Sequence, residues 1–201
     1  MALHDRILSH FQISAQTIQD AAEALAPSIE QAARLMVHSL TQGGKIMACG
    51  NGGSAADAQR FVAQMVHRFE QERPGLAAIA LTTDSSTLTS IANDTAYDQV
   101  FARQVKVLGQ PGDILLAIST SGNSPSVLQA VDAAHTRSVH VIALSGRSGG
   151  QLAERLVERL VQDDVLLCAF AESAARIQEI HLLTIHCLCD AVDSVLLGVE
   201  E

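Results

Sequence analysis

The sequence predicts one α/β domain: a three-layer sandwich with a five-stranded parallel sheet between two layers of helices. Short apolar runs without alternation recur along the chain, and such runs are typical of strands buried on both faces. Segments with the apolar spacing of helices separate these runs, which is the order of elements in a parallel sheet with crossover helices. With 201 residues, the chain is long enough for one such domain with a full core.

The composition narrows the class of protein. Hydrophobic residues make up 48% and charged residues 17%, which indicates a globular chain, and with no Trp and 3% aromatics its core must be aliphatic. The net charge of −9 argues against direct binding to nucleic acid or to an anionic membrane. No apolar run approaches the roughly 18 residues of a membrane span and no signal peptide opens the chain, so we expect a cytoplasmic protein. The cysteines should be reduced, and their spacing contains no C-x-x-C zinc motif.

Residues 1–43 are expected to form two extra N-terminal helices that precede the sheet core and closing helix of residues 44–201. The first helix spans 4–26, Pro27 breaks the pattern, and the second spans 28–42 before Gly43 and Gly44. Because both helices precede the first strand, they cannot be crossovers within the sheet. They are expected to pack on the side of the sheet or against another subunit, and the apolar residues of the first helix favour the subunit contact.

Five strands and the helices between them fill the rest of the chain. The strands are expected at 45–49, 76–81, 114–118, 140–144 and 165–168. A closing helix over 173–197 carries apolar residues on more than one face, so nearly all of its sides must be covered. One sheet offers too little cover for this helix and the N-terminal helices together, which predicts a homo-oligomer with closed symmetry, a homotetramer.

Two turns that follow buried strands are candidate ligand sites. The turn at 50–54 is rich in glycine, which lets a ligand approach the backbone closely, and the turn at 119–124 carries four hydroxyls and a glycine. Ser124 is expected to cap a helix that begins at Pro125, so free N–H groups and the helix dipole would stabilise an anion, most naturally a phosphate. Both turns fall at the carboxyl ends of strands, where parallel sheets bind their ligands. An ordinary capped loop is the alternative reading of the second turn.

Five segments together resemble one known family. They are CGNGGS at 49–54, ERPGLAAIALTTD at 72–84, IAND at 91–94, ISTSGNS at 118–124 and ARIQEIHLLTIHCLCD at 175–190. They look like the phosphoheptose isomerase group of sugar-isomerase (SIS) domains. The resemblance implies a flavodoxin-like SIS fold and conversion of sedoheptulose 7-phosphate to D-glycero-D-manno-heptose 7-phosphate, a precursor of the lipopolysaccharide core. The stretches ERP and CLCD also resemble the initiator-associating protein DiaA, a tetramer that binds the replication initiator DnaA.

The resemblance implies phosphosugar-binding residues at positions that match the family pattern. The turn at 119–124 would take the phosphate, while Asp94 and the turn at 51–53 would reach the sugar hydroxyls. His186 matches the catalytic histidine, which is also a zinc ligand in some members; a core or interface histidine is the alternative reading. The implied substrate-binding residues are Asn51, Gly52, Gly53, Asn93, Asp94, Ser119, Thr120, Ser121, Ser124 and Gln178.

Departures from the family pattern bear on the chemistry. The group carries a histidine and a glutamate where this chain has Arg60 and Gln64, and an aspartate where it has Ala175. Gln64 therefore stands at the catalytic base position, but its amide has no basic site, and losing a general base costs on the order of 10²–10⁴ in rate. Since arginine does not normally ligate zinc, no metal cofactor is expected. Asp57 lies on the same helical stripe and could substitute as the base, or pair with Arg60 instead.

Two classes of function follow from these observations. The chain is a phosphosugar isomerase that is weak or has a displaced base, or it keeps the phosphosugar pocket but acts as a DiaA-like, non-enzymatic partner of DnaA. A metabolic sensor would combine pocket and partner. All of these readings share the intact turn at 119–124, while the substitutions at 60 and 64 count against catalysis.

Overall fold

A five-stranded, all-parallel sheet forms the centre of the computed structural model, which describes residues 2–158 and 163–198. The strand order is β2-β1-β3-β4-β5. This confirms the predicted α/β fold with a parallel sheet. The strands are β1 (Ile46–Gly50), β2 (Ala78–Ala80), β3 (Ile114–Ser119), β4 (His140–Gly146) and β5 (Val165–Ala169).

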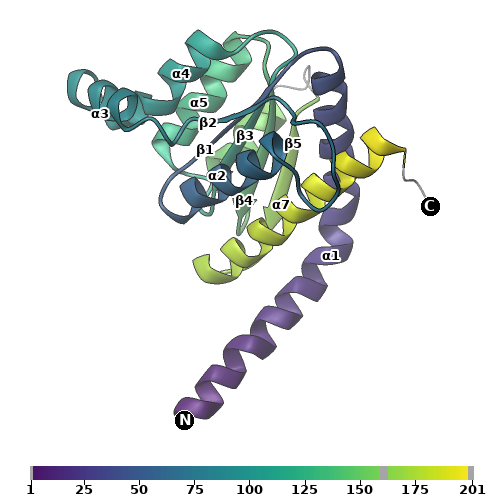
Figure 1. Cartoon of the computed structure of the whole chain (residues 1–201). Helices are drawn as coiled ribbons and strands as arrows, with labels where there is room; N and C mark the ends of the chain where they lie inside the picture. The colour runs from purple at the N-terminus through teal and green to yellow at the C-terminus, as the bar shows by residue number, and fades with distance from the viewer. Residues whose placement is uncertain (1, 159–162, 199–201) are drawn as a thin grey trace.

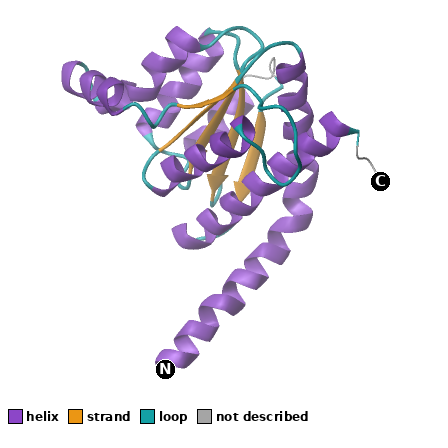
Figure 2. Ribbon diagram, in the orientation of Figure 1, coloured by secondary structure: helices purple, strands orange, loops and turns teal. Residues whose placement is uncertain are grey.

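Helices cover both faces of the sheet (Figure 2). Alternate residues of each strand point to opposite faces, so Ile46 and Ile114 join one apolar core while Met47 and Leu115 join the other. The first core is closed by α1 (Leu3–Thr41), α2 (Gly53–Val66) and α7 (Ala174–Leu197). The second is closed by α3 (Ser85–Asp94), the 3₁₀ turn η1 (Tyr97–Gln99), α4 (Val100–Leu108), α5 (Pro125–Thr136) and α6 (Gly150–Glu158). The sequence predicts that the helix beginning near Gly150 continues to about residue 161, and that end lies outside the described residues.

The N-terminal region is a single helix. α1 continues through Pro27, so the prediction of two separate N-terminal helices is wrong. A proline inside a helix removes one N–H donor and crowds the carbonyl four residues earlier, which costs about 3 kcal/mol. The apolar stripe nevertheless continues across it, because Leu25 and Met36 are buried and Ile29 packs against the same core. Burial of this stripe outweighs the lost hydrogen bond.

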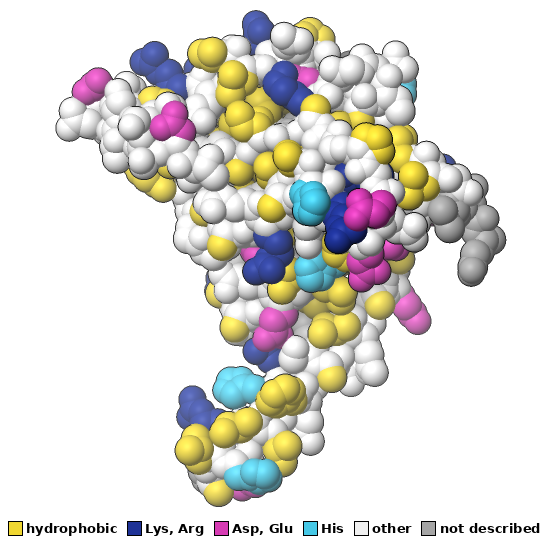
Figure 3. Space-filling view, viewed as in Figure 1, with side chains coloured by type: hydrophobic (Ala, Val, Ile, Leu, Met, Phe, Trp, Pro, Cys, Tyr) yellow, Lys and Arg dark blue, Asp and Glu magenta, His cyan; other side chains and the backbone are white. Residues whose placement is uncertain are grey.

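The first half of α1 projects away from the rest of the chain (Figure 1). Large apolar side chains on this projection are open to solvent, and hydrophobic atoms gather at its end in the space-filling view (Figure 3). Exposed apolar residues in such number are unusual on a surface that faces only water. They are Leu3, Ile7, Leu8, Phe11 and Ile13.

α7 is the one described helix that is long and apolar enough, by length and composition, to cross a membrane. No unbroken apolar run of that length occurs within it, because Arg176, Glu179, Asp190 and Asp193 interrupt the sequence. The helix packs against α1 and α2, and its residues Ile177, Ile185 and Leu188 are buried in the first core. α7 is therefore a core helix of the domain.

Candidate functional site

A small polar cavity lies at the carboxyl edge of the sheet, between the turns that follow β1 and β3. Its volume is about 130 Å³. The turns meet there because β1 and β3 are neighbouring parallel strands and end at the same level, with Gly50 paired to Ile118. The cavity is lined by Asn51, Ser54, Ile118, Ser119, Thr120, Ser121 and Ser124. Five of these side chains carry a hydroxyl and one an amide.

Asn51 ties the two turns together. Its Nδ2 donates hydrogen bonds of 2.8 Å to Ser124 Oγ and 2.9 Å to Ser126 Oγ, and its Oδ1 accepts one of 2.8 Å from the hydroxyl of Tyr97. Ser124 does occupy the N-cap position of α5, with Pro125 after it, but its side chain makes no capping bond. The predicted role of the Ser124 hydroxyl is thus corrected: it is turned to Asn51 instead.

The turn at 119–124 is held from behind by the start of α6. Gly122 has a φ of +65°, and a Cβ on it would lie 1.9 Å from the carbonyl oxygen of Gly149, so only glycine fits. Leu152 N donates to Gly122 O at 2.9 Å and Gln151 N donates to Asn123 Oδ1 at 3.0 Å. These bonds use the first N–H groups of α6, and they fix the turn without occupying its cavity side.

Three backbone donors of the turn remain available. Within residues 2–158 and 163–198, the N–H groups of Thr120, Ser121 and Ser124 donate no hydrogen bond to the protein. They sit beside the hydroxyls that line the cavity, just before the N-terminus of α5. Free N–H groups, hydroxyls and a helix N-terminus are the groups that stabilise a phosphate.

Gln178 reaches the glycine turn from α7. A Cβ added to Gly53 would lie 2.6 Å from Gln178 Nε2, so the amide of Gln178 occupies the space that a side chain would fill. Gly52, with a φ of +57°, forms the N-cap position of α2 and leaves open space on its own Cβ side. The structure therefore brings Gln178 together with the turn at 51–53, as the predicted site requires.

Gln64 and His186 lie farther along the same pair of helices. Gln64 Oε1 accepts a hydrogen bond of 3.3 Å from Cys189 Sγ, and its carbonyl accepts one of 3.0 Å from Arg73 Nη2. The His186 ring stacks on Phe69 with a centroid distance of 5.6 Å. His186 is half-buried, whereas Arg60 is exposed. No ion pair joins Asp57 to Arg60 among the described residues, so their predicted pairing is wrong.

Asn93 and Asp94 do not line the polar cavity. Both side chains are exposed at the end of α3, where Asn93 Nδ2 donates a hydrogen bond of 2.8 Å to Asp94 Oδ1. Asp94 instead borders a separate hollow of about 610 Å³ between β2, α3 and α4. Their connection to the cavity is through the chain, because Tyr97 follows Asp94 by three residues and bonds to Asn51.

Sequence reasoning missed Tyr97, Ser126 and Ser54. Tyr97 and Ser126 hold Asn51, and Ser54 lines the cavity. Tyr97 is the single tyrosine of the chain and is largely exposed. A polar aromatic residue just after the IAND segment was the available signal. His181, buried and hydrogen-bonded through Nε2 to Ser145 O at 2.9 Å, is a core residue, and burial lowers its pKa.

The residues present do not fit a zinc ion. The described residues contain no cluster of three or more His, Cys, Asp or Glu side chains placed to hold a metal. Arg60 offers only hydrogen-bond donors, and Gln64 and Gln178 offer neutral amides. His186 is therefore the one strong zinc ligand among these four residues. We therefore derive no chemistry through a metal.

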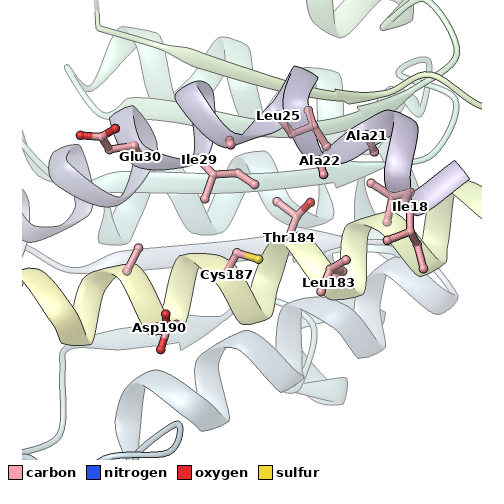
Figure 4. A pocket seen from close by; sticks show the side chains of 13 residues that line it. Ile18, Ala21, Ala22, Leu25, Ile29, Glu30, Leu183, Thr184, Cys187 and Asp190 are labelled. Atoms are coloured by element: carbon pink, nitrogen blue, oxygen red, sulfur yellow. The ribbon is translucent and has the colours of Figure 1, made fainter. Parts of the chain in front are cut away.

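A larger hollow of about 390 Å³ lies between α1 and α7 (Figure 4). Its walls are almost entirely aliphatic, with Ile18, Leu25 and Ile29 from one helix facing Leu183 from the other. Glu30 and Asp190 stand at its border. Its polar lining is limited to Thr184, Cys187 and the two carboxylates, which do not suit a phosphate, and it shares no lining residue with the polar cavity.

A parallel sheet with two ligand turns at its carboxyl edge, one of them rich in hydroxyls, defines a sugar-isomerase domain. The chain belongs to this family, since the SIS domain model matches residues 10–146. Within it, the chain belongs to the phosphoheptose isomerase group. It is 77% identical over all 201 residues to a phosphoheptose isomerase of Thiobacillus denitrificans, with both chains fully covered.

Two solved structures show the same relationship. The phosphoheptose isomerase GmhA from Neisseria gonorrhoeae is 51% identical, with a TM-score of 0.89, and the match covers 96% of this chain and all of that one. A phosphoheptose isomerase from Francisella tularensis is 46% identical, with a TM-score of 0.91 over the same shares of the two chains. These similarities confirm the expected family and the SIS fold.

Proposed function

We propose that this chain is a phosphosugar isomerase that interconverts sedoheptulose 7-phosphate and D-glycero-D-manno-heptose 7-phosphate, a precursor of the lipopolysaccharide core. The observation that carries the proposal is the hydroxyl-lined cavity between the turns after β1 and β3. The substrate is taken from the relatives, which are named phosphoheptose isomerases and match the whole chain.

The phosphate is assigned to the turn at 119–124. The hydroxyls of Ser119, Thr120 and Ser121 line the cavity, and the N–H groups of Ser121 and Ser124 are available to an anion. Charge-assisted hydrogen bonds to phosphate oxygens are stronger than neutral ones, so several such donors bind a phosphate well. No basic side chain lines the cavity, and backbone and hydroxyl donors therefore carry the binding.

The sugar is assigned to the glycine turn and its neighbours. Asn51 borders the phosphate turn, Gly52 and Gly53 follow it in the chain, and Gln178 lies against Gly53. Asn93 and Asp94 remain proposed sugar ligands, because Tyr97 ties their segment to Asn51. In this arrangement the sugar extends from the sheet edge along α2 and α7, toward Gln64 and His186.

Catalysis requires a base and an acid, because an aldose–ketose isomerase moves a proton between adjacent carbons through an enediol. His186 is the proposed proton donor: it is half-buried on α7, two turns beyond Gln178 on the same stripe. Gln64 occupies the base position without a basic atom. Turnover by this chain is therefore proposed to be slower than turnover by an enzyme with a carboxylate at that position.

The test combines binding and turnover of sedoheptulose 7-phosphate. Calorimetry of the parent and of Ser121→Ala should show weaker binding by the variant, because a cavity hydroxyl is lost. Proton NMR of the sugar should show slow formation of the aldose with the parent. Equal affinities of the two proteins would remove the phosphate assignment, and a parent that binds without any turnover would remove the isomerase assignment.

A second candidate function is a DiaA-like regulator that binds the initiator DnaA. It is favoured by the combination of an intact cavity with Arg60 and Gln64 at positions where catalysis needs a histidine and a carboxylate. A pull-down with purified DnaA, with and without sedoheptulose 7-phosphate, tests it. Binding of DnaA by a parent that lacks turnover would make this the function, and a sugar-dependent signal would indicate a sensor.

We also propose a cytoplasmic homotetramer. The exposed apolar residues of the first half of α1 and the aliphatic hollow between α1 and α7 support self-association. Both features lie on α1, which one sheet cannot cover (Figures 1 and 4). Closed symmetry is the usual way in which a soluble chain buries such faces.

A further inference from the structure

α2 and α7 pack side by side and run in the same direction (Figure 1). Near one end Gly53 lies against the amide of Gln178, and near the other Gln64 accepts its hydrogen bond from Cys189. Both contacts join residues that are 125 positions apart in the sequence. Both helices rise about 1.5 Å per residue. Each residue of α2 between these two contacts therefore lies beside the residue of α7 that is 125 positions later in the sequence.

Asp57 lies on the face of α2 that points at α7. It follows Gly53 by four residues and precedes Gln64 by seven, and residues at these spacings share one stripe of a helix. The matched register places it level with Leu182, which is midway between Gln178 and His186. Asp57 is also one helical turn, about 6 Å, beyond the glycine turn. The core-facing stripe of α2 is a different one, made of Ser54, Ala58, Phe61 and Met65.

The Asp57 carboxylate is half-buried and unpaired. No described side chain forms an ion pair or a hydrogen bond with it. Burial raises the pKa of the Asp57 carboxyl, and the charge of nearby Arg60 lowers it by less. A carboxylate that is partly removed from water and free of a partner is a stronger base than one on an open surface.

From this placement we infer that Asp57, rather than Gln64, is the carboxylate base of the isomerisation. The inference deepens the proposed function and rests on it. With the 7-phosphate held in the turn at 119–124, the reacting carbons C1 and C2 lie at the far end of the sugar. In this orientation that end extends along α2 and α7, the two helices that carry Asp57 and His186.

The step is a proton transfer that needs no oxidant or reductant. The Asp57 carboxylate takes a proton from C1 of the ketose, the C–H electron pair forms the C1–C2 double bond, and the C2 carbonyl oxygen gains a proton from His186. Asp57 then returns its proton to C2, while His186 takes the proton of the C1 hydroxyl. The products are the aldose and the two side chains in their starting states.

The test is Asp57→Asn, which removes the basic oxygen and keeps the size of the side chain. The kcat for sedoheptulose 7-phosphate should fall by about 10²–10⁴, the usual contribution of a general base. The dissociation constant from calorimetry should change by less than about threefold, since the phosphate turn is untouched. Adding Gln64→Glu to this variant supplies a second carboxylate on the same stripe and should recover part of the lost rate.

The matched control is Asp132→Asn on α5, across the sheet from the site. Asp132 is also a partly exposed aspartate, paired with Arg155 at 3.2 Å, and its loss should leave kcat unchanged. The inference is supported if kcat falls for Asp57→Asn but not for Asp132→Asn. Retained sugar binding by Asp57→Asn would show that this variant is folded. An Asp57→Asn variant with the kcat of the parent overturns it while the isomerase function stands. A parent without turnover overturns that function and the inference with it.

Discussion

The hydroxyl of Tyr97 donates a hydrogen bond of 2.8 Å to Oδ1 of Asn51, and this bond joins the segment after α3 to the edge of the polar cavity. Asn51 in turn holds Ser124 and Ser126 through its Nδ2. Tyr97 thus fixes which way the Asn51 amide faces. Because the ring is largely exposed, its contribution is to the orientation of the site and not to the core.

Tyr97→Phe is expected to weaken sugar binding with little effect on folding. One neutral hydrogen bond contributes about 0.5–1.5 kcal/mol, so the dissociation constant should rise roughly two- to tenfold. Calorimetry with sedoheptulose 7-phosphate measures this. Tyr97 is the only tyrosine and the chain has no Trp, so the intrinsic fluorescence of the parent should also change when the sugar binds. Unchanged affinity in the phenylalanine variant would show that Tyr97 does not serve the site.

Gly53→Ala should disturb the site through Gln178. The new methyl would lie 2.6 Å from Gln178 Nε2, and this flexible amide must move away. Thermal stability should barely change, because no backbone or buried apolar atom is displaced. Sugar affinity should fall, and it should fall no further when Gln178→Ala is added, since both changes remove the same contact. Strictly additive losses would mean that the two residues act independently.

The apolar surface of α1 predicts a homotetramer in solution. Light scattering at micromolar concentration should give four times the mass of one chain. Phe11→Asp places a charge on the exposed projection and should shift the protein to smaller species. Val157→Asp, on α6, is the control, because Val157 is about as exposed but lies away from α1. A parent that scatters as a monomer would contradict the proposal.

No zinc should be bound in stoichiometric amount. Arg60 cannot ligate a metal and its charge repels one, and the other two positions that match the zinc ligands beside His186 hold the neutral amides of Gln64 and Gln178. Elemental analysis of protein purified without chelator should find well under one zinc per chain. One tightly held zinc per chain would show that the donor argument is incomplete.

The sheet and the two ligand turns could be predicted because they depend on local pattern. The run from Ile114 to Ile118 has no polar residue that could face solvent, and such a run is typical of a strand buried on both faces. The break predicted at Pro27 is wrong because it was based on local pattern alone. Leu25 and Met36, on either side of Pro27, are both buried against the core, and this packing keeps the helix continuous. Tertiary burial outweighs local propensity there.

The finer geometry of the site depends on contacts between distant segments, which the sequence does not reveal. Ser124 has the composition of a helix cap, yet Asn51, distant in sequence, takes its hydroxyl. Asp57 and Arg60 have the spacing of an ion pair, yet the structure leaves the carboxylate unpaired. The nearness of Gly53 to Gln178 follows from the packing of α2 on α7 and has no local signal.

The central claim is that the phosphosugar cavity is complete and that the chemistry is limited by the residues at 60 and 64. The direct measurement is turnover and binding of sedoheptulose 7-phosphate by the parent and by the double variant Arg60→His, Gln64→Glu. Gln64→Glu restores a carboxylate of nearly the same volume, and Arg60→His removes a charge that would pair with it. The account predicts a slow parent and a variant whose kcat is at least about tenfold higher, with a nearly unchanged dissociation constant. A parent that is already efficient, or a variant that binds the sugar and turns over no faster, would contradict it.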